Sequence, residues 1–169
     1  VEAIAISSFN KNENEVESRF VNLKYIKDDE WIFFTNYSSK KAKDFLSHDQ
    51  ISALFHWPST NVQIRIKAKI RKSNLDLSDD HFKKRTVKKN ALAISSNQSN
   101  PINSYDDIIK NYNRVLNSEN LLCKRPEYWG GYSFTPYYFE FWEGHDSRIN
   151  KRRIFYKNDL VWQFIVLQP

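Results

Sequence analysis

Hydrophobic and polar residues alternate along much of this chain, and alternation with period two predicts β-strands that are buried on one face. The clearest case is 62–71, VQIRIKAKIR, where the apolar residues share one face and Gln63 shares the other with four basic residues. The same pattern predicts further strands at 3–9, 18–25, 31–35, 51–55, 132–134, 138–143, 152–157 and 161–167.

Helical periodicity together with capping residues predicts about three helices. The first begins at Ser38 or Ser39, the second spans 78–88 with Ser78 as its cap, and the third spans 104–116. So many short strands with so few helices predict a mainly β fold, with the strands arranged in a closed or nearly closed barrel.

Two predicted elements carry basic residues that a bound anion would explain. In the strand 18–25, Arg19 and Lys24 fall on opposite faces, so a β-bulge or the strand end must re-aim one of them if both serve one site. Lys40 and Lys41 lie in the first turn of the first helix, where the helix dipole disfavours cations. A phosphate bound there would resolve the conflict, and two solvated lysines are the alternative.

The stretch 128–153, YWGGYSFTPYYFEFWEGHDSRINKRR, holds all three glycines of the chain and two of its five tryptophans. Glycine is needed where the backbone approaches another group closely or adopts a positive φ, so we expect tight packing or a ligand here. Arg148, Lys151, Arg152 and Arg153 follow the aromatic part. Aromatic faces beside guanidinium groups suit a planar anionic ligand, and a hydrophobic hairpin with a solvated basic end is the alternative.

Composition narrows the choice of function. The length of 169 residues indicates one domain, the 15% of aromatic residues predicts an aromatic-rich core, and the net charge of +6 favours anionic partners. The single cysteine, Cys123, excludes an internal disulfide and fits a cytoplasmic location. No membrane span or signal peptide is visible. The chain opens in a strand pattern and contains no Met, so we expect residues upstream to be missing.

Signatures of hydrolytic or metal-dependent catalysis are missing from the sequence. His48, His56, His81 and His145 lie at no metal-ligand spacing, and neither a phosphate-binding loop nor G-x-G-x-x-G occurs. The remaining signals are cationic and aromatic, so we expect no metal. If the protein is an enzyme, a cofactor supplies the reactivity.

Six blocks occur in order and at compatible spacing: R-F-V-N-L-K (19–24), F-F-T-N-Y-S-S-K-K-A (33–42), the strand with Gln63, Gln98-Ser99, W-G-G (129–131) and E-F-W-E-G (140–144) with its trailing arginines. In these blocks, and collinearly from 1 to 169, the chain resembles the pyridoxamine 5′-phosphate oxidases, FMN enzymes with a split β-barrel fold. The resemblance implies a single FMN-binding split-barrel domain over 1–169, with 126–169 as the C-terminal dimerisation and active-site region. It also implies a homodimer with FMN at the subunit interface.

The resemblance implies a set of site residues by position. For FMN they are Arg19, Lys24, Phe34, Thr35, Lys40, Lys41, Gln63, Gln98, Ser99, Trp142 and Arg152, with Arg19, Lys40 and Lys41 on its phosphate. For a phosphorylated substrate they are Lys24, His81, Arg85, Lys89 and Arg148, and Arg148 and Asn150 are the catalytic candidates.

Lys40 and Phe34 replace a usual arginine and a usual tyrosine at FMN positions, and three positions on the substrate side also depart from the family pattern. Asn150 replaces a histidine, His81 replaces a phosphate-binding tyrosine, and Lys89 replaces a phosphate-binding serine. His81 and Lys89 can still hold a phosphate, since a cation can replace a hydroxyl at an anion site, whereas Asn150 cannot titrate. The N-terminal lid that family members fold over the substrate has no counterpart in these residues.

The implied function is FMN-dependent oxidation of pyridoxamine or pyridoxine 5′-phosphate, with hydride transfer to FMN N5 and reduction of O₂ to H₂O₂, as in pyridoxal phosphate biosynthesis. One alternative keeps the fold and FMN but changes the substrate, as in phenazine-biosynthesis relatives. Another is a module without turnover that binds flavin or, through its basic strand, RNA. The first interpretation involves neither nucleic acid nor a membrane.

Overall fold

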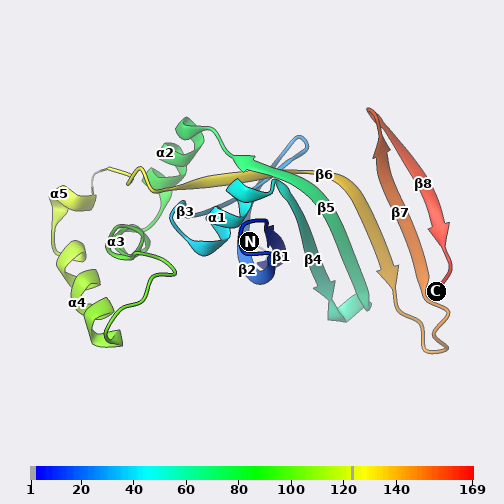
Figure 1. Cartoon of the computed structure of the whole chain (residues 1–169), viewed down its shortest axis with the longest axis horizontal. Helices are drawn as coiled ribbons and strands as arrows, with labels where there is room; N and C mark the ends of the chain where they lie inside the picture. Colours follow the sequence, from blue (N-terminus) through cyan, green and yellow to red (C-terminus); the bar gives the residue numbers. More distant parts are fainter. Residues whose placement is uncertain (1–2, 123) are drawn as a thin grey trace. The chain divides into compact units, whose positions relative to one another are not determined.

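Eight strands form one mostly antiparallel sheet in the order β3-β2-β1-β4-β5-β6-β7-β8 (Figure 1). An additional pairing of β3 with β6 closes the first six of these strands into a barrel, and β7 and β8 continue the sheet from β6. The prediction of a mainly β fold with a nearly closed barrel is thereby confirmed. The computed structural model describes residues 3–122 and 124–169, so Cys123 lies outside the described residues.

The strands agree with the alternation in the sequence, with one exception. They are β1 Ala3–Asn10, β2 Glu15–Lys27, β3 Glu30–Asn36, β4 Gln50–Trp57, β5 Val62–Lys72, β6 Trp129–Glu143, β7 Lys151–Asn158 and β8 Val161–Leu167. The exception is β6, which the sequence analysis divided into two strands on either side of Pro136. Proline lacks an N–H group, but its fixed φ is compatible with an extended backbone, so the strand continues through it.

The helices differ more from the prediction. They are α1 Lys40–Ser47, the 3₁₀ turn η1 Pro58–Thr60, α2 Leu75–Lys84, α3 Val87–Ser95, α4 Tyr105–Leu116 and α5 Glu119–Leu122. The cap of α4 is confirmed, because Ser104 accepts a hydrogen bond from the N–H of Asp107. The predicted helix 78–88 is wrong: Asn74 caps α2, Arg85 is extended, and Thr86 caps α3. One helix therefore begins before the predicted range, at the cap Asn74, and a second begins inside it, at the cap Thr86.

The chain divides into two compact units, and each is described by itself. The first unit comprises Val1–Phe33, Asp44–Arg71 and Ser133–Pro169, and the second comprises Phe34–Lys43 and Lys72–Tyr132. Most of the strand residues belong to the first unit, and α2 to α5 belong to the second. A single domain over 1–169 stays a prediction.

Aromatic rings fill the core of the first unit. Trp31 on β3 packs against Phe55, Phe134 and Phe139, with ring centroids 5.9 to 6.1 Å away. Phe33 on the same strand is fully buried and also contacts Phe134. The aromatic-rich core predicted from composition is therefore present.

Close packing explains Gly130 at the start of β6. None of the three glycines has a positive φ, so close approach is the reason for glycine here rather than backbone conformation. A Cβ atom on Gly130 would lie 2.7 Å from Cζ of Tyr37, whose ring is held by a hydrogen bond from Oη to the carbonyl of Gly131 and by edge-on contact with Tyr132. Of the two sequence expectations, tight packing is confirmed.

Replacing Gly130 with Ala is expected to destabilise the protein by about 1–3 kcal/mol, because the added methyl group forces Tyr37 out of a packed position. Chemical denaturation of wild type and variant measures this difference. A loss below about 0.5 kcal/mol, typical of an unconstrained surface site, would contradict the packing explanation.

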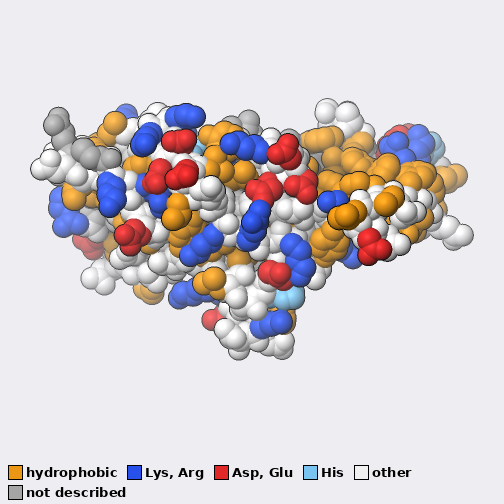
Figure 2. Space-filling view, turned by 90° about the horizontal axis from the view of Figure 1, so that it is seen from above, with side chains coloured by type: hydrophobic (Ala, Val, Ile, Leu, Met, Phe, Trp, Pro, Cys, Tyr) orange, Lys and Arg blue, Asp and Glu red, His pale blue; other side chains and the backbone are white. Residues whose placement is uncertain are grey.

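The hairpin of β7 and β8 exposes an unusual amount of apolar surface. On β8 the exposed fractions are 61% for Val161, 42% for Trp162, 54% for Phe164, 41% for Ile165 and 67% for Val166. Figure 2 shows hydrophobic side chains gathered over this part of the first unit, at the right of the view. An exposed apolar edge strand of this kind is typical of a protein–protein interface. Among the described residues, no helix is long and apolar enough to cross a membrane.

Candidate functional site

Strand β2 contains a β-bulge at Lys24. Leu23 pairs with Phe33 and Tyr25 pairs with Ile32, so Lys24 is the extra residue in the register. A bulge breaks the strict alternation of side chains and re-aims the residue at its centre. The irregularity that a site shared by Arg19 and Lys24 would need is therefore present, at Lys24.

Arg19, the other cation of β2, lies among carboxylates of the first unit. Its Nη1 donates to Oγ of Ser8 at 2.6 Å, and its Nη2 lies 3.1 Å from Glu17 and 3.2 Å from Asp44. Asp44 is 1% exposed and also accepts hydrogen bonds from Ser8 and Asn10. These contacts fix the guanidinium of Arg19, but the two carboxylates offset its positive charge and so weaken its attraction for a phosphate. A role of Arg19 in binding the FMN phosphate stays a prediction.

Three candidate residues of the first unit lie in one row across neighbouring strands. The N–H of Gly144, just after β6, donates to the carbonyl of Asn61, just before β5, at 3.0 Å, and the two strands run in opposite directions (Figure 1). Counting along both strands from this bond, we infer that Gln63 of β5 lies opposite Trp142 of β6. Trp142 in turn pairs with Arg152 of β7. The structure therefore brings the amide of Gln63 to an indole and a guanidinium that lie far from it in the sequence.

Glu140 positions Arg152 in this row, a function that the sequence analysis did not find. The carboxylate is 1% exposed and receives Nε and Nη2 of Arg152 at 2.9 and 2.7 Å. Its other oxygen accepts Nη1 of Arg65 at 3.0 Å and the hydroxyl of Tyr138 at 3.1 Å. The signal in the sequence was a carboxylate in the middle of the aromatic run Y-Y-F-E-F-W (137–142), because such a group must be paired when it is buried.

The basic face of β5 is largely neutralised within the first unit. Arg65 pairs with Glu140, Lys69 with Asp49, and Arg71 with Glu30, while Nζ of Lys67 lies 4.8 Å from the centre of the Tyr138 ring. A row of cations that are already paired with carboxylates offers less to a phosphate backbone than the sequence alone indicates. This observation disfavours the alternative of an RNA platform.

In the second unit, Thr35, Lys41 and Gln98 are joined by hydrogen bonds. The Thr35 hydroxyl donates to Oε1 of Gln98 at 3.2 Å, and Nζ of Lys41 lies 3.4 Å from Oγ1 of Thr35 and 3.4 Å from Oγ of Ser39. Ser39 directly precedes α1, and Lys40 is the first residue of that helix. The predicted cation-bearing helix start is therefore correct, and it lies beside two further candidate residues.

Phe34 and His81, two further candidate residues of the second unit, stack on each other. Their rings are 3.8 Å apart and inclined by 11°, and both are nearly parallel to the indole of Trp129. The histidine that replaces the family's tyrosine is therefore held flat against Phe34, a candidate FMN contact. Trp129 was known from the sequence only as part of W-G-G.

Arg85 occupies the turn between α2 and α3. Its guanidinium lies 4.3 Å from the centre of the Trp129 ring, and its Nη2 donates to the backbone carbonyl of Lys89 at 3.0 Å. Burial lowers the pKa of Arg85 from its usual value, but an arginine remains charged at neutral pH. Within the described part of the chain, Nη1 of Arg85 is buried and has no hydrogen-bond partner. An unpaired, partly buried cation of this kind needs an anion.

Backbone strain marks two of the candidate residues. Among the residues that the structure describes, six non-glycine residues have positive φ, and four of them are asparagine or aspartate, which tolerate this region. The other two are Ser99, with φ of 71°, and Arg148, with φ of 64°. Strained backbone is concentrated at functional positions, so the strain at Ser99 and at Arg148 supports their assignment independently of the motifs.

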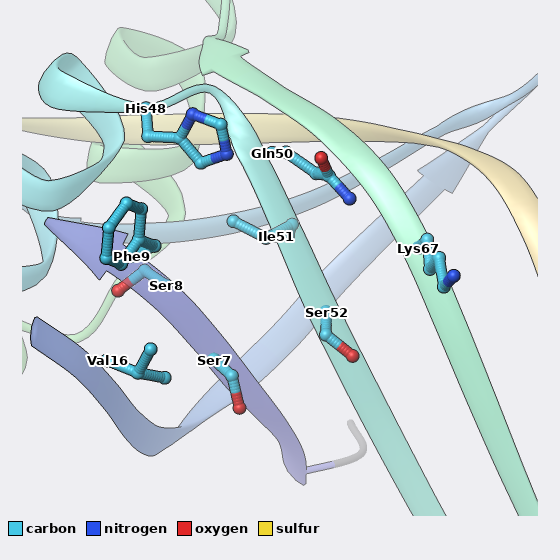
Figure 3. A pocket seen from close by; sticks show the side chains of 9 residues that line it. All are labelled: Ser7, Ser8, Phe9, Val16, His48, Gln50, Ile51, Ser52 and Lys67. Atoms are coloured by element: carbon cyan, nitrogen blue, oxygen red, sulfur yellow. The ribbon is translucent and has the colours of Figure 1, made fainter. Parts of the chain in front are cut away.

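A cavity of about 270 Å³ opens on the outer face of β1 and β4, entirely within the first unit. Ser7, Ser52, His48 and Lys67 are among its lining residues (Figure 3). None of the candidate residues lines it. The cavity therefore contributes nothing to the site predicted from the sequence.

Comparisons with known proteins identify the family to which this chain is similar. Residues 2–127 match the family model described as pyridoxamine 5′-phosphate oxidase, and residues 129–169 match the one described as pyridoxine 5′-phosphate oxidase C-terminal dimerisation region. A pyridoxine/pyridoxamine 5′-phosphate oxidase of Hydrogenovibrio crunogenus is 34% identical over 172 residues, covering 99% of this chain and 78% of that protein.

Two solved structures show the same fold. PhzG from Burkholderia lata, crystallised with tetrahydrophenazine-1-carboxylic acid, has a TM-score of 0.91 at 24% identity and covers 99% of this chain and 82% of its own. An FMN-binding, pyridoxamine 5′-phosphate oxidase-related protein from Nostoc punctiforme has a TM-score of 0.80 at 12% identity, with 99% and 87% covered.

Proposed function

The chain belongs to the pyridoxamine 5′-phosphate oxidase family, and we propose that it oxidises pyridoxamine or pyridoxine 5′-phosphate to pyridoxal 5′-phosphate. It is an FMN-dependent oxidoreductase of this family. With the amine, substrate, O₂ and water give aldehyde, ammonia and H₂O₂. With the alcohol, substrate and O₂ give aldehyde and H₂O₂.

The chemistry of the available donors fits FMN. In the second unit, the ammonium of Lys41, the hydroxyl of Thr35 and the amide of Gln98 suit a phosphate and a hydroxylated chain. In the first unit, the row of Trp142, Gln63 and Arg152 offers an aromatic face with polar groups beside it, which suits a flat heterocycle. When bound, FMN supplies the redox chemistry by accepting a hydride and passing two electrons to O₂.

The unpartnered Nη1 of Arg85 is the observation that carries the choice of a phosphorylated substrate. The turn between α2 and α3 fixes the guanidinium, and the Trp129 ring supports its face. A phosphate would satisfy Nη1 with a charge-assisted hydrogen bond. Lys89, whose carbonyl accepts Nη2 of Arg85, and His81, four residues before Arg85 in the chain, add a second cation and an imidazole to the phosphate-binding group that we propose.

Arg148 and Lys24 complete the proposed set on the substrate side. The left-handed backbone at Arg148 and the bulge at Lys24 each aim a cation in a direction that regular structure would not give. Both residues hold and orient the substrate, so that the carbon bearing the amine or alcohol is presented for oxidation.

A twofold dimer built on β7 and β8 is expected from the exposed apolar surface of β8 and from the match to a dimerisation region. We propose that each FMN lies at this subunit interface. Replacing Phe164, which is 54% exposed and packs against Phe155, with Asp should raise the dimer dissociation constant about 100-fold. Sedimentation velocity over a concentration series measures this change.

Gln163→Asp is the matched control, since it adds the same charge to the same strand and changes a polar residue. It is expected to remain dimeric at concentrations at which Phe164→Asp dissociates. A wild-type protein that sediments as a monomer and still holds FMN would contradict the shared site.

Substrate oxidation is tested by release of H₂O₂ and formation of pyridoxal 5′-phosphate from the FMN-loaded protein in air. The proposal expects turnover with pyridoxamine or pyridoxine 5′-phosphate and almost none with unphosphorylated pyridoxine. Turnover of a reduced phenazine precursor instead, with none of the B6 phosphates, would move the assignment to an FMN oxidoreductase with another substrate.

A further inference from the structure

The loop between β6 and β7, residues 144–150, carries Arg148 in a conformation that arginine does not adopt by itself. Its φ of 64° is in the left-handed region, where the side chain of an L-residue crowds its own backbone. Glycine and asparagine adopt this conformation most readily, and arginine does not, so the residue type at position 148 does not stabilise the turn. Contacts elsewhere in the loop must therefore hold it.

Those contacts form a small network around His145. Its backbone N–H donates to Oδ1 of Asn150 at 3.0 Å, and its carbonyl accepts the N–H of Arg148 at 2.9 Å. Its ring Nδ1 accepts the N–H of Ser147 at 3.2 Å. The hydrogen bonds from Ser147 to the His145 ring and from Arg148 to the His145 carbonyl are local, because they join residues two and three positions apart. The bond from His145 to Asn150 instead joins the two ends of the loop. Asn150 is also half-buried, while 145–149 are exposed.

We propose that Asn150 is a positioning residue for Arg148 rather than a catalytic group. Its side-chain carbonyl ties the last residue of the loop to His145, and the closed loop holds the left-handed backbone from which Arg148 extends. This role rests on the proposed function only in that Arg148 binds the substrate.

The chemistry of the asparagine side chain suits this role. An amide carbonyl accepts a hydrogen bond at every ordinary pH, and it neither gains nor loses a proton. With its Oδ1 committed to the backbone of His145, the carbonyl of Asn150 is held by the loop and is not available to the substrate. Asn150, in place of the histidine expected from the family pattern, therefore provides a hydrogen bond that closes the loop instead of a ring that can gain or lose a proton.

Two variants of similar size separate the hydrogen bond from the shape of the side chain. Asn150→Leu removes the acceptor, and Asn150→Asp keeps it. Ile149→Ala, at a neighbouring residue that is 68% exposed, is the control for general disturbance of the loop. Each protein is examined by hydrogen–deuterium exchange of 144–150 and by steady-state kinetics with pyridoxine 5′-phosphate.

Asn150→Leu is expected to speed exchange in the loop about tenfold and to raise KM about tenfold, with kcat changed less than about twofold. Asn150→Asp is expected to restore most of the protection and most of the affinity, and Ile149→Ala to resemble wild type. A shift in KM without kcat is the result that separates positioning from chemistry.

Three results would overturn the proposal: unchanged exchange in Asn150→Leu, equal impairment of Asn150→Asp and Asn150→Leu, or a kcat of Asn150→His well above wild type. The last would mean that the position supplies chemistry. If wild type oxidises no B6 phosphate, the proposed function fails, but the exchange measurements still decide whether Asn150 holds the loop.

Discussion

Replacing Arg85 with Met is expected to lower kcat/KM for pyridoxine 5′-phosphate about 100-fold, equivalent to about 3 kcal/mol. The wild-type guanidinium has a buried Nη1 without a partner among the described residues, so a bound phosphate gains a charge-assisted bond with little competition. Methionine keeps an unbranched apolar stem that can still lie on the Trp129 ring, and it removes the guanidinium together with its hydrogen bond to the carbonyl of Lys89. Steady-state assays of H₂O₂ release measure the loss.

Lys88→Met is the control for Arg85→Met, because it removes one positive charge from an exposed residue of α3 nearby in the chain. It is expected to change kcat/KM less than about twofold, as distant exposed charges are screened by salt. A phosphorylated substrate that Arg85→Met and wild type turn over equally well would contradict the assignment of this residue.

Lys41→Met is expected to weaken FMN binding about 30-fold, equivalent to about 2 kcal/mol, while riboflavin binding changes little. The reason is that Lys41 lies at the positive end of α1, beside Thr35 and Ser39, where its charge is unfavourable until a phosphate arrives. Riboflavin lacks the phosphate, so it loses nothing when the lysine is removed. Quenching of flavin fluorescence during titration of the apoprotein gives both affinities.

Lys43→Met on the same helix is the matched control. Lys43 is exposed, and its replacement removes the same charge without altering the first turn. Its affinity for FMN is expected to stay near that of wild type. An equal loss of riboflavin affinity in Lys41→Met would indicate damage to the fold instead of loss of a phosphate contact.

Much of the fold was predictable because alternation is a local signal with one physical cause, the burial of one face. It identified β5 and most other strands, and it placed Arg19 and Lys24 on opposite faces of a regular β2, so that one site could use both only with an irregularity in the strand. The division of 78–88 could not be predicted in the same way. Ser78 is as good a cap as Asn74, and only packing decides between them: Ser78 is fully buried, and its hydroxyl accepts the N–H of Gly131.

The candidate site shows the same limit. Motifs gave the cations and aromatic residues of the site, but not the groups that hold them. Glu140 and Asp44 are buried carboxylates that position Arg152 and Arg19, and each pairing joins two different elements, β6 with β7 and α1 with β2. Backbone strain at Arg148 likewise has no signature in composition or spacing. Partners of buried charges therefore have to be read from the structure.

The central claim, that this FMN enzyme oxidises a B6 phosphate, is tested most directly by mixing FMN-loaded protein with pyridoxamine 5′-phosphate without oxygen. The account predicts that the visible absorbance of the flavin is lost in one turnover, with one equivalent of pyridoxal 5′-phosphate formed, and returns on admission of air. A flavin that stays oxidised with pyridoxamine and pyridoxine 5′-phosphate alike would contradict it.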